Sequence, residues 1–214
     1  MSHSNSPDCS ASARRRCPLP PLLTSLAPHR YATNAGFFDF PPHAACEGNL
    51  VIGGRVLQFL TPSRTSVALN GSHALVGYST NATIGASAVT SLVSGLGWLV
   101  RDGADYVKLG REYSAGNSFF TEWAPRTGAG WRTDGAGLLL TVDGIEGTSA
   151  AAGADLFEFA DLLIELGAVA AMNLDGGGST TAALHGAVYN SPHCADTWAV
   201  CERDVTSITC VNGR

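Results

Sequence analysis

The sequence predicts an α+β fold, with a mixed, largely antiparallel sheet and one or two packed helices. Short apolar runs alternate with glycine-containing turns along most of the chain, which is typical of successive β-hairpins. Only Asp155–Leu166 carries apolar residues at convincing helical spacing. Because many hairpins accompany a single clear helix, a sheet with a helix packed on it is the architecture that buries both apolar faces.

The chain has 214 residues, a length that suits one domain with a sizeable core. Residues 1–30 are rich in Ser, Pro and Arg, and we expect a poorly ordered or truncated N-terminal segment there. The globular pattern begins at Tyr31, so residues 31–214 are expected to form the domain. Leu22–Ala27 is too short for the apolar part of a signal peptide, and no signal peptide is recognised.

Composition and residue spacing argue against several classes of function. The net charge is −5, so no broad basic face is expected and no nucleic-acid partner is predicted. No apolar run approaches the ~18 residues that a membrane span needs. The histidines lack HExxH spacing and the cysteines lack CxxC pairs, so neither a metal site nor a cofactor is predicted.

Turn signals divide the first half of the chain into strands. Gly53-Gly54 and Asp102-Gly103 are pairs typical of tight hairpin turns. Ser79–Thr90 is small and polar and favours neither helix nor strand, whereas Glu112–Thr121 is predicted to be a loop. The predicted strands are Ala32–Phe40, two within Asn49–Leu57, Leu75–Tyr78, and two within Gly97–Lys108.

The second half holds the predicted helix and the strand expected at the centre of the sheet. Asp155 is suited to cap the helix, Glu158 completes a capping box, and Gly167 is suited to end it. The apolar run Ala168–Leu174 follows directly and is predicted to be the central strand. The other predicted strands are Glu122–Trp131, Leu138–Val142 (expected to be buried), the hairpin Thr181–Tyr189, and Val205–Val211.

The central strand leads into a run of three glycines within Asn173–Thr180 (NLDGGGST). Each glycine weakens a helix or strand by about 1 kcal/mol relative to Ala, so we expect backbone N–H groups that approach an anion closely. A plain tight turn is the structural alternative. No Gly-Lys-Ser/Thr, helix-opening GxGxxG or GxSxG motif is present, which argues against nucleotide loops and a serine-hydrolase elbow. The candidate binding residues here are Asn173, Gly176, Gly177, Gly178, Ser179 and Thr180.

Further polar side chains lie near the ends of predicted strands, where a rigid scaffold aims functional groups. Arg126, next to Thr127, has a forked guanidinium that suits phosphate or carboxylate. Asp175 and Asp143 are the candidate catalytic carboxylates, with Asp175 first. Asn34 is expected to orient the substrate or these carboxylates. Each has a structural alternative, as an ion-paired surface residue or as a turn residue.

The cysteine count and two sequons indicate an oxidising compartment. An even number of cysteines, spread to both ends of the chain, fits three disulfides. Asn70-Gly-Ser and Asn81-Ala-Thr are candidate N-glycosylation sites. The cysteines are Cys9, Cys17, Cys46, Cys194, Cys201 and Cys210.

At these residues the chain resembles the phosphodiester glycosidase family. Asn173–Thr180 and Thr33–Phe38 (TNAGFF) are the most specific blocks, and the second adds Gly36 as a candidate substrate-binding residue. The resemblance spans most of residues 31–214, in order and with compatible spacing. The other matching blocks are Gly48–Val51, Leu92–Asp102, Arg126-Thr127, Asp143-Gly144, Leu156–Leu163, Ser191–Cys194, Trp198, Cys201 and Val205–Val211.

The resemblance implies an activity, a class of partner and a location. The C-terminal cysteines match the animal members of the family, which remove N-acetylglucosamine from an α-1-phosphodiester and so expose mannose 6-phosphate. The implied partners are the phosphorylated N-glycans of lysosomal hydrolases, and the implied location is the lumen of the Golgi or secretory pathway. The resemblance also implies the disulfides Cys194–Cys201, Cys17–Cys210 and Cys9–Cys46.

The chemistry of such a bond fits the candidate residues. A phosphate monoester leaves as an anion and needs little protonation, so a cradle of hydrogen-bond donors can replace a general acid. We expect the Gly176–Ser179 backbone and Arg126 to hold the phosphate, and Asp175 or Asp143 to support the oxocarbenium-like centre or to activate water. Two alternatives stay open: action on another sugar-1-phosphodiester, and a non-catalytic glycan-binding module.

Overall fold

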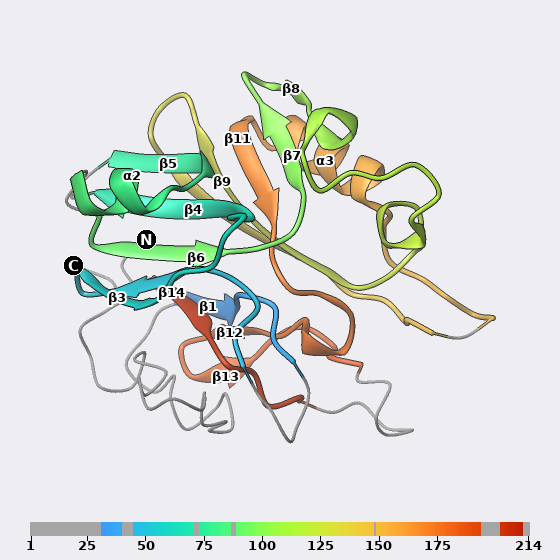
Figure 1. Ribbon diagram of the computed structural model, residues 1–214. Coiled ribbons are helices and arrows are strands. Elements are labelled where there is room, and N and C mark those ends of the chain that lie inside the picture. The colour runs from blue at the N-terminus through green and yellow to red at the C-terminus, as the bar shows by residue number, and fades with distance from the viewer. Residues whose placement is uncertain are drawn as a thin grey trace.

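The computed structural model describes residues 31–39, 45–70, 73–86, 89–147, 149–193 and 202–211. These residues form three sheets and two α-helices (Figure 1). Every strand pair among them is antiparallel, so the mixed sheet expected from the sequence is not found. The α+β label is therefore coarse, because strands build most of the fold.

The central sheet contains the strand that leads to the glycine run. Its strands, in spatial order, are β10 (Gly137–Val142), β9 (Arg126–Arg132), β11 (Ala168–Asn173), β7 (Trp98–Arg101) and β8 (Ala104–Asp105). The central place of β11 and the β7–β8 hairpin confirm the predictions for those segments. The expected burial of Leu138–Val142 is wrong, because β10 is an edge strand and these residues are only half-buried.

The second sheet packs against the central one. Its strands, in spatial order, are β3 (Arg55–Gln58), β2 (Leu50–Ile52), β6 (Ser91–Ser94), β4 (Thr65–Asn70) and β5 (His73–Tyr78). Val67 and Val93 of this sheet share one buried cluster with Met172 and Leu174, which fixes the end of β11. In a second cluster, Ile84 of helix α2 (Asn81–Ala86) packs on the sheet.

Helix α3 (Leu156–Glu165) confirms the predicted helix and its caps. Asp155 Oδ1 accepts hydrogen bonds of 2.8 Å from the N–H groups of Phe157 and Glu158, and Glu158 Oε2 accepts from the Asp155 N–H at 3.2 Å. Gly167 follows with φ of +86°, a conformation that suits glycine at a helix end. Phe159 is among the fully buried side chains that pack the helix against β7 and β11, and its burial stabilises the fold by about 1.5–3 kcal/mol.

The third sheet joins the first and last described strands. Its spatial order is β13 (Ala187–Val188), β12 (Ala182–Leu184), β1 (Tyr31–Asn34) and β14 (Ile208–Val211). The β12–β13 hairpin is as predicted, whereas the closing strand is shorter than the expected Val205–Val211. The glycine run connects β11 to β12 and therefore lies where the central sheet meets the third sheet (Figure 1).

Candidate active site

Backbone hydrogen bonds fix the glycine loop, which we define as residues 174–181, to two neighbouring strands. The N–H of Leu174 donates to the Thr127 carbonyl of β9, and the N–H of Asp175 donates to the Ala35 carbonyl just after β1, both at 2.8 Å. Gly177 N–H donates to the Pro125 carbonyl, also at 2.8 Å. The loop is therefore a rigid part of the scaffold, as a binding site requires.

Close contacts explain why glycine is needed at two of its positions. A Cβ on Gly176 would lie 2.7 Å from the Pro125 carbonyl oxygen. A Cβ on Gly177 would overlap the carboxylate of Glu146, and Gly177 has φ of +57°, which disfavours other residues. Gly177–Ser179 forms a single 3-10 turn. The loop is thus a tight turn between β11 and β12, as the plain-turn alternative has it, and it also accommodates the Glu146 side chain.

The expected cradle of several available N–H groups is not what the structure contains. The N–H groups of Gly177, Ser179 and Thr180 donate to backbone carbonyls. Gly176 N–H donates to the carboxylate of Asp175 at 2.9 Å. Gly178 N–H donates to Glu146 Oε1 at 3.0 Å, so this donor already holds an anion.

Asp175 is the titratable centre of the site. Burial raises the pKa of Asp175 to about 7. Its hydrogen bonds with Ser179 and the Gly176 N–H lower the pKa, as does the charge of Arg203, whereas Glu146 raises it. A carboxyl group with a pKa near neutrality can exchange a proton under physiological conditions, which is typical of an acid/base catalyst.

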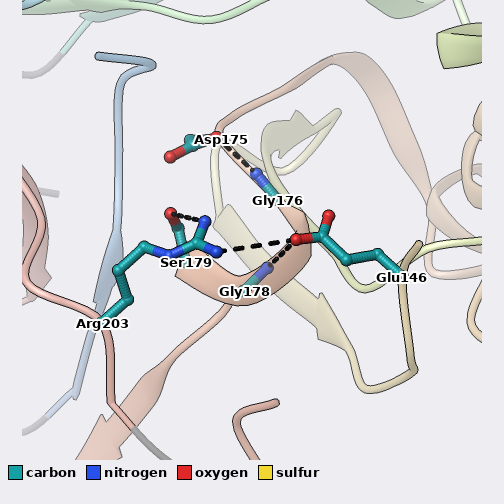
Figure 2. Close-up of polar contacts among 6 residues, drawn as sticks. All are labelled: Glu146, Asp175, Gly176, Gly178, Ser179 and Arg203. Atoms are coloured by element: carbon teal, nitrogen blue, oxygen red, sulfur yellow. Dashed lines mark hydrogen bonds and ion pairs between the residues drawn. The ribbon is translucent and has the colours of Figure 1, made fainter. Parts of the chain in front are cut away.

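Glu146 and Arg203 complete the site, and the sequence analysis identified neither. Arg203 Nη2 lies 3.7 Å from Glu146 Oε1, and Arg203 Nη1 donates to Ser179 Oγ at 3.4 Å. Figure 2 shows both side chains converging on the glycine loop beside Asp175. The Arg203 side chain is 11% exposed and that of Glu146 is 31% exposed, so their charges are only partly screened by water.

Asn34 and Thr127 are both fully buried, and they hold the glycine loop in place through hydrogen bonds. Asn34 Nδ2 donates to the Asp175 carbonyl at 2.6 Å, and Asn34 Oδ1 accepts from Thr127 Oγ1 at 2.8 Å and from the Thr181 N–H at 3.3 Å. This network ties β1 and β9 to the backbone of the catalytic candidate. It favours a positioning role for both residues over direct contact with substrate.

Three other candidate residues are also buried at the base of the loop. Gly36 N–H donates to Ser207 Oγ at 2.9 Å, and Asn173 Nδ2 donates to the Leu96 carbonyl at 3.1 Å. The Thr180 carbonyl accepts from Asn190 at 3.2 Å. The expected contacts of Gly36, Asn173 and Thr180 with substrate stay predictions, and these bonds assign each residue a structural task.

Arg126 is the candidate whose geometry differs most from the expectation. Its side chain is buried, and its guanidinium donates to the carbonyls of Ala154 (3.0 Å), Phe119 (3.1 Å) and Glu122 (2.7 Å). Burial lowers its pKa. A guanidinium committed to three carbonyls organises the surrounding loops, so the structure favours a scaffold role for Arg126 over the phosphate contact.

Asp143 is exposed and clamps the segment that follows β13. Its carboxylate accepts from Asn190 Nδ2 at 2.8 Å and from the Ser191 N–H at 3.0 Å. Asn190 in turn donates to the Thr180 carbonyl, so Asp143 reaches the loop only through another side chain. This arrangement favours Glu146 over Asp143 as the second carboxylate of the site.

The described residues include only some of the cysteines expected to form disulfides. Cys210 is disulfide-bonded, but its expected partner Cys17 lies outside the described residues, as do both members of the expected Cys194–Cys201 pair. Cys9 also lies outside the described residues, so the expected Cys9–Cys46 pairing stays a prediction.

Glycosylation at Asn81, which is exposed, and at Asn70, which is half-buried, stays a prediction. Within the described residues there is no group of three or more His, Cys, Asp or Glu side chains arranged to hold a metal ion. Nor does any helix in this part of the chain have the length and hydrophobicity needed to cross a bilayer.

Comparisons with known proteins identify the family. The phosphodiester glycosidase family matches residues 29–212. The bovine N-acetylglucosamine-1-phosphodiester α-N-acetylglucosaminidase is 33% identical over 85% of this chain, and the human one is 30% identical over 94%. This chain spans 36% and 41% of the length of those relatives.

Solved structures give the same result for the fold. The catalytic domain of the zebrafish N-acetylglucosamine-1-phosphodiester α-N-acetylglucosaminidase, described as auto-inhibited by its pro-peptide, superposes with a TM-score of 0.78 at 25% identity, covering 98% of this chain and 70% of that one. A hypothetical protein from Synechocystis shares the fold with a TM-score of 0.67 at 17% identity, over 86% of this chain and 54% of its own. This protein therefore belongs to the phosphodiester glycosidase family.

Proposed function

We propose that this chain hydrolyses the C1–O bond of N-acetylglucosamine α-1-phosphodiesters. In this proposal it releases N-acetylglucosamine from the phosphorylated N-glycans of lysosomal hydrolases and exposes mannose 6-phosphate, within the lumen of the Golgi or secretory pathway. The activities for which the bovine and human relatives are named support the choice of sugar and linkage. The observation that carries the proposal is the carboxyl group of Asp175, with a pKa of about 7, placed beside a guanidinium and a hydroxyl on the glycine loop.

The proposed reaction assigns separate tasks to the two halves of the site. The sugar C1–O bond breaks with both electrons going to the phosphate oxygen, and a water molecule adds to C1. Arg203, which donates to Ser179 Oγ, receives the phosphate in this scheme, so the leaving anion is stabilised by a fixed donor in the way an oxyanion hole works.

Asp175 acts as a carboxylate in this scheme. It supports the oxocarbenium-like centre or takes a proton from the attacking water, after which the proton passes to solvent. Asn34 holds the backbone of Asp175, and Thr127 holds Asn34, so both are positioning residues. The leaving phosphate monoester is stable as an anion, and the reaction needs no acid on that side.

The test is the release of N-acetylglucosamine from N-acetylglucosamine α-1-phospho-mannose by the purified chain, with EDTA and with added divalent metal as parallel arms. Turnover of this substrate above that of the α-glucose and α-galactose phosphodiesters is the expected result. Preference for another sugar would move the proposal to that sugar. Tight binding without turnover in either arm would replace it with a glycan-binding role.

A further inference from the structure

The charges around the glycine loop are unusual for a site that binds phosphate. A guanidinium, Arg203, faces two carboxyl groups, Asp175 and Glu146, and the charges of Arg203 and Glu146 both act on Asp175. Sites built to hold a dianionic phosphate normally surround it with cations and unoccupied backbone donors. Here one cation is shared with a resident carboxylate.

Glu146 lies where an anion would otherwise bind. Its Oε1 atom accepts the Gly178 N–H at 3.0 Å and lies 3.7 Å from Arg203 Nη2, so it contacts both kinds of donor that phosphate uses (Figure 2). Its other oxygen lies against the Gly177 Cα, where a Cβ would overlap it. The absence of a side chain at Gly177 thus leaves space for the Glu146 carboxylate, so the loop is shaped to hold this carboxylate.

We propose that Glu146 is the specificity-determining residue that makes this site accept monoanionic sugar phosphodiesters and reject dianionic phosphomonoesters. This inference rests on the proposed function and defines the accepted substrates by the charge of their phosphate group. A phosphodiester carries one negative charge, which Arg203 can balance beside the Glu146 carboxylate. A phosphomonoester has a second pKa of about 6 and therefore carries close to two charges at neutral pH. The additional charge is placed near Glu146, where Arg203 is the cation that the described residues supply.

The same charge difference separates substrate from product. Hydrolysis with water converts the monoanionic diester into neutral N-acetylglucosamine and a phosphate monoester, and one proton is released as the monoester becomes a dianion. The charge on the leaving phosphate therefore doubles beside a fixed carboxylate. Repulsion by Glu146 weakens the binding of the monoester product and so favours its departure over inhibition.

The size of the effect follows from Coulomb's law. An additional unit charge about 6 Å from a carboxylate, in a partly exposed site with an effective dielectric constant of about 40, changes affinity about tenfold. Glu146→Gln keeps the shape and the oxygen that accepts the Gly178 N–H but removes the charge. The variant should therefore bind dianions better without the same gain for monoanions.

The experiment compares two ligands that the protein does not hydrolyse. These are the C-glycosidic phosphonate of N-acetylglucosamine, in which a CH2 group replaces the glycosidic oxygen, and its monomethyl ester. Calorimetry at alkaline pH, where the free phosphonate is a dianion and the ester a monoanion, gives two dissociation constants. We expect wild type to prefer the ester and Glu146→Gln to reduce that preference about tenfold. Glu165→Gln, which removes an exposed charge from α3, is the matched control and should leave the preference unchanged.

Each outcome decides the inference. An unchanged preference in Glu146→Gln, or a wild-type preference for the dianion, would overturn it even where wild type hydrolyses the natural diester. Should Glu146→Gln not fold, Glu146→Ala removes the same charge and gives the same comparison. Binding of neither ligand would overturn the inference together with the phosphate site. Absence of hydrolysis with the expected preference intact would overturn only the proposed reaction.

Discussion

Replacing Asp175 with Asn is expected to stabilise the folded protein at high pH while removing the carboxylate that we propose is catalytic. Burial raises the pKa of Asp175 from 3.8 to about 7, so above neutral pH the native state holds a charge that the unfolded chain keeps fully hydrated. Asn has nearly the same shape, and its carbonyl oxygen can still accept the Gly176 N–H that Asp175 Oδ1 accepts at 2.9 Å. Packing should therefore change little, which leaves the charge as the main difference.

The sign and size of the effect follow from proton linkage. Between about pH 4 and pH 7 the native state binds a proton that the unfolded chain has already lost, so the contribution of this group to stability falls as pH rises through that window. It is constant above the window and absent below it. At 1.36 kcal/mol per pKa unit, a displacement from 3.8 to about 7 corresponds to about 4 kcal/mol.

Urea unfolding of wild type and Asp175→Asn at several pH values measures this directly. The variant should be more stable by up to about 4 kcal/mol near pH 8 and by almost nothing near pH 4. A difference that is the same at both ends would refute the raised pKa. A variant less stable than wild type near pH 8 would show that hydrogen bonds to Asp175 outweigh its burial.

Three further predictions concern the same site. Arg203→Gln should raise the KM for phosphodiesters at least tenfold, because it removes the cation beside Ser179. The control Arg132→Gln, which removes an exposed charge, should leave KM unchanged. An equal loss of activity on an uncharged aryl glycoside would contradict the phosphate role of Arg203. Arg126→Ala should lower the free energy of unfolding by about 3 to 5 kcal/mol, since a buried guanidinium and its hydrogen bonds to three carbonyls are lost. Normal stability with lost phosphodiester binding would restore the phosphate contact to Arg126. The kcat/KM of wild type should rise with pH around a midpoint near 7 as Asp175 ionises, and a falling profile would make Asp175 an acid.

Helix caps and turn residues in the sequence were enough to predict the helix and the hairpins, because these elements depend on neighbouring residues. The capping box of Asp155 and Glu158 identified α3, and paired turn residues such as Asp102-Gly103 identified hairpins. β4 escaped prediction because nearly all its residues are buried, so it shows no apolar–polar alternation. β6 is four buried residues long and has the same difficulty. The second sheet was therefore only partly foreseen.

The residues of the candidate site also differ in how far the sequence could predict them. The glycine loop and Asp175 could be singled out because a run of glycines directly after a carboxylate is unusual in sequence. Glu146 and Arg203 could not, since each meets the loop through contacts 32 and 24 residues apart in the chain, and neither lies in a recognisable motif. Arg126 was assigned to phosphate because the type of side chain is visible in a sequence, whereas its burial among carbonyls is not.

Hydrolysis of N-acetylglucosamine α-1-phospho-mannose in water enriched in ¹⁸O tests the central claim most directly. If the chain cleaves the sugar C1–O bond, the label appears in the released N-acetylglucosamine and the mannose 6-phosphate stays unlabelled. Asp175→Asn, confirmed to be folded, should form neither product at a measurable rate. Label in the phosphate would show attack at phosphorus and would contradict the account, as would full activity of Asp175→Asn.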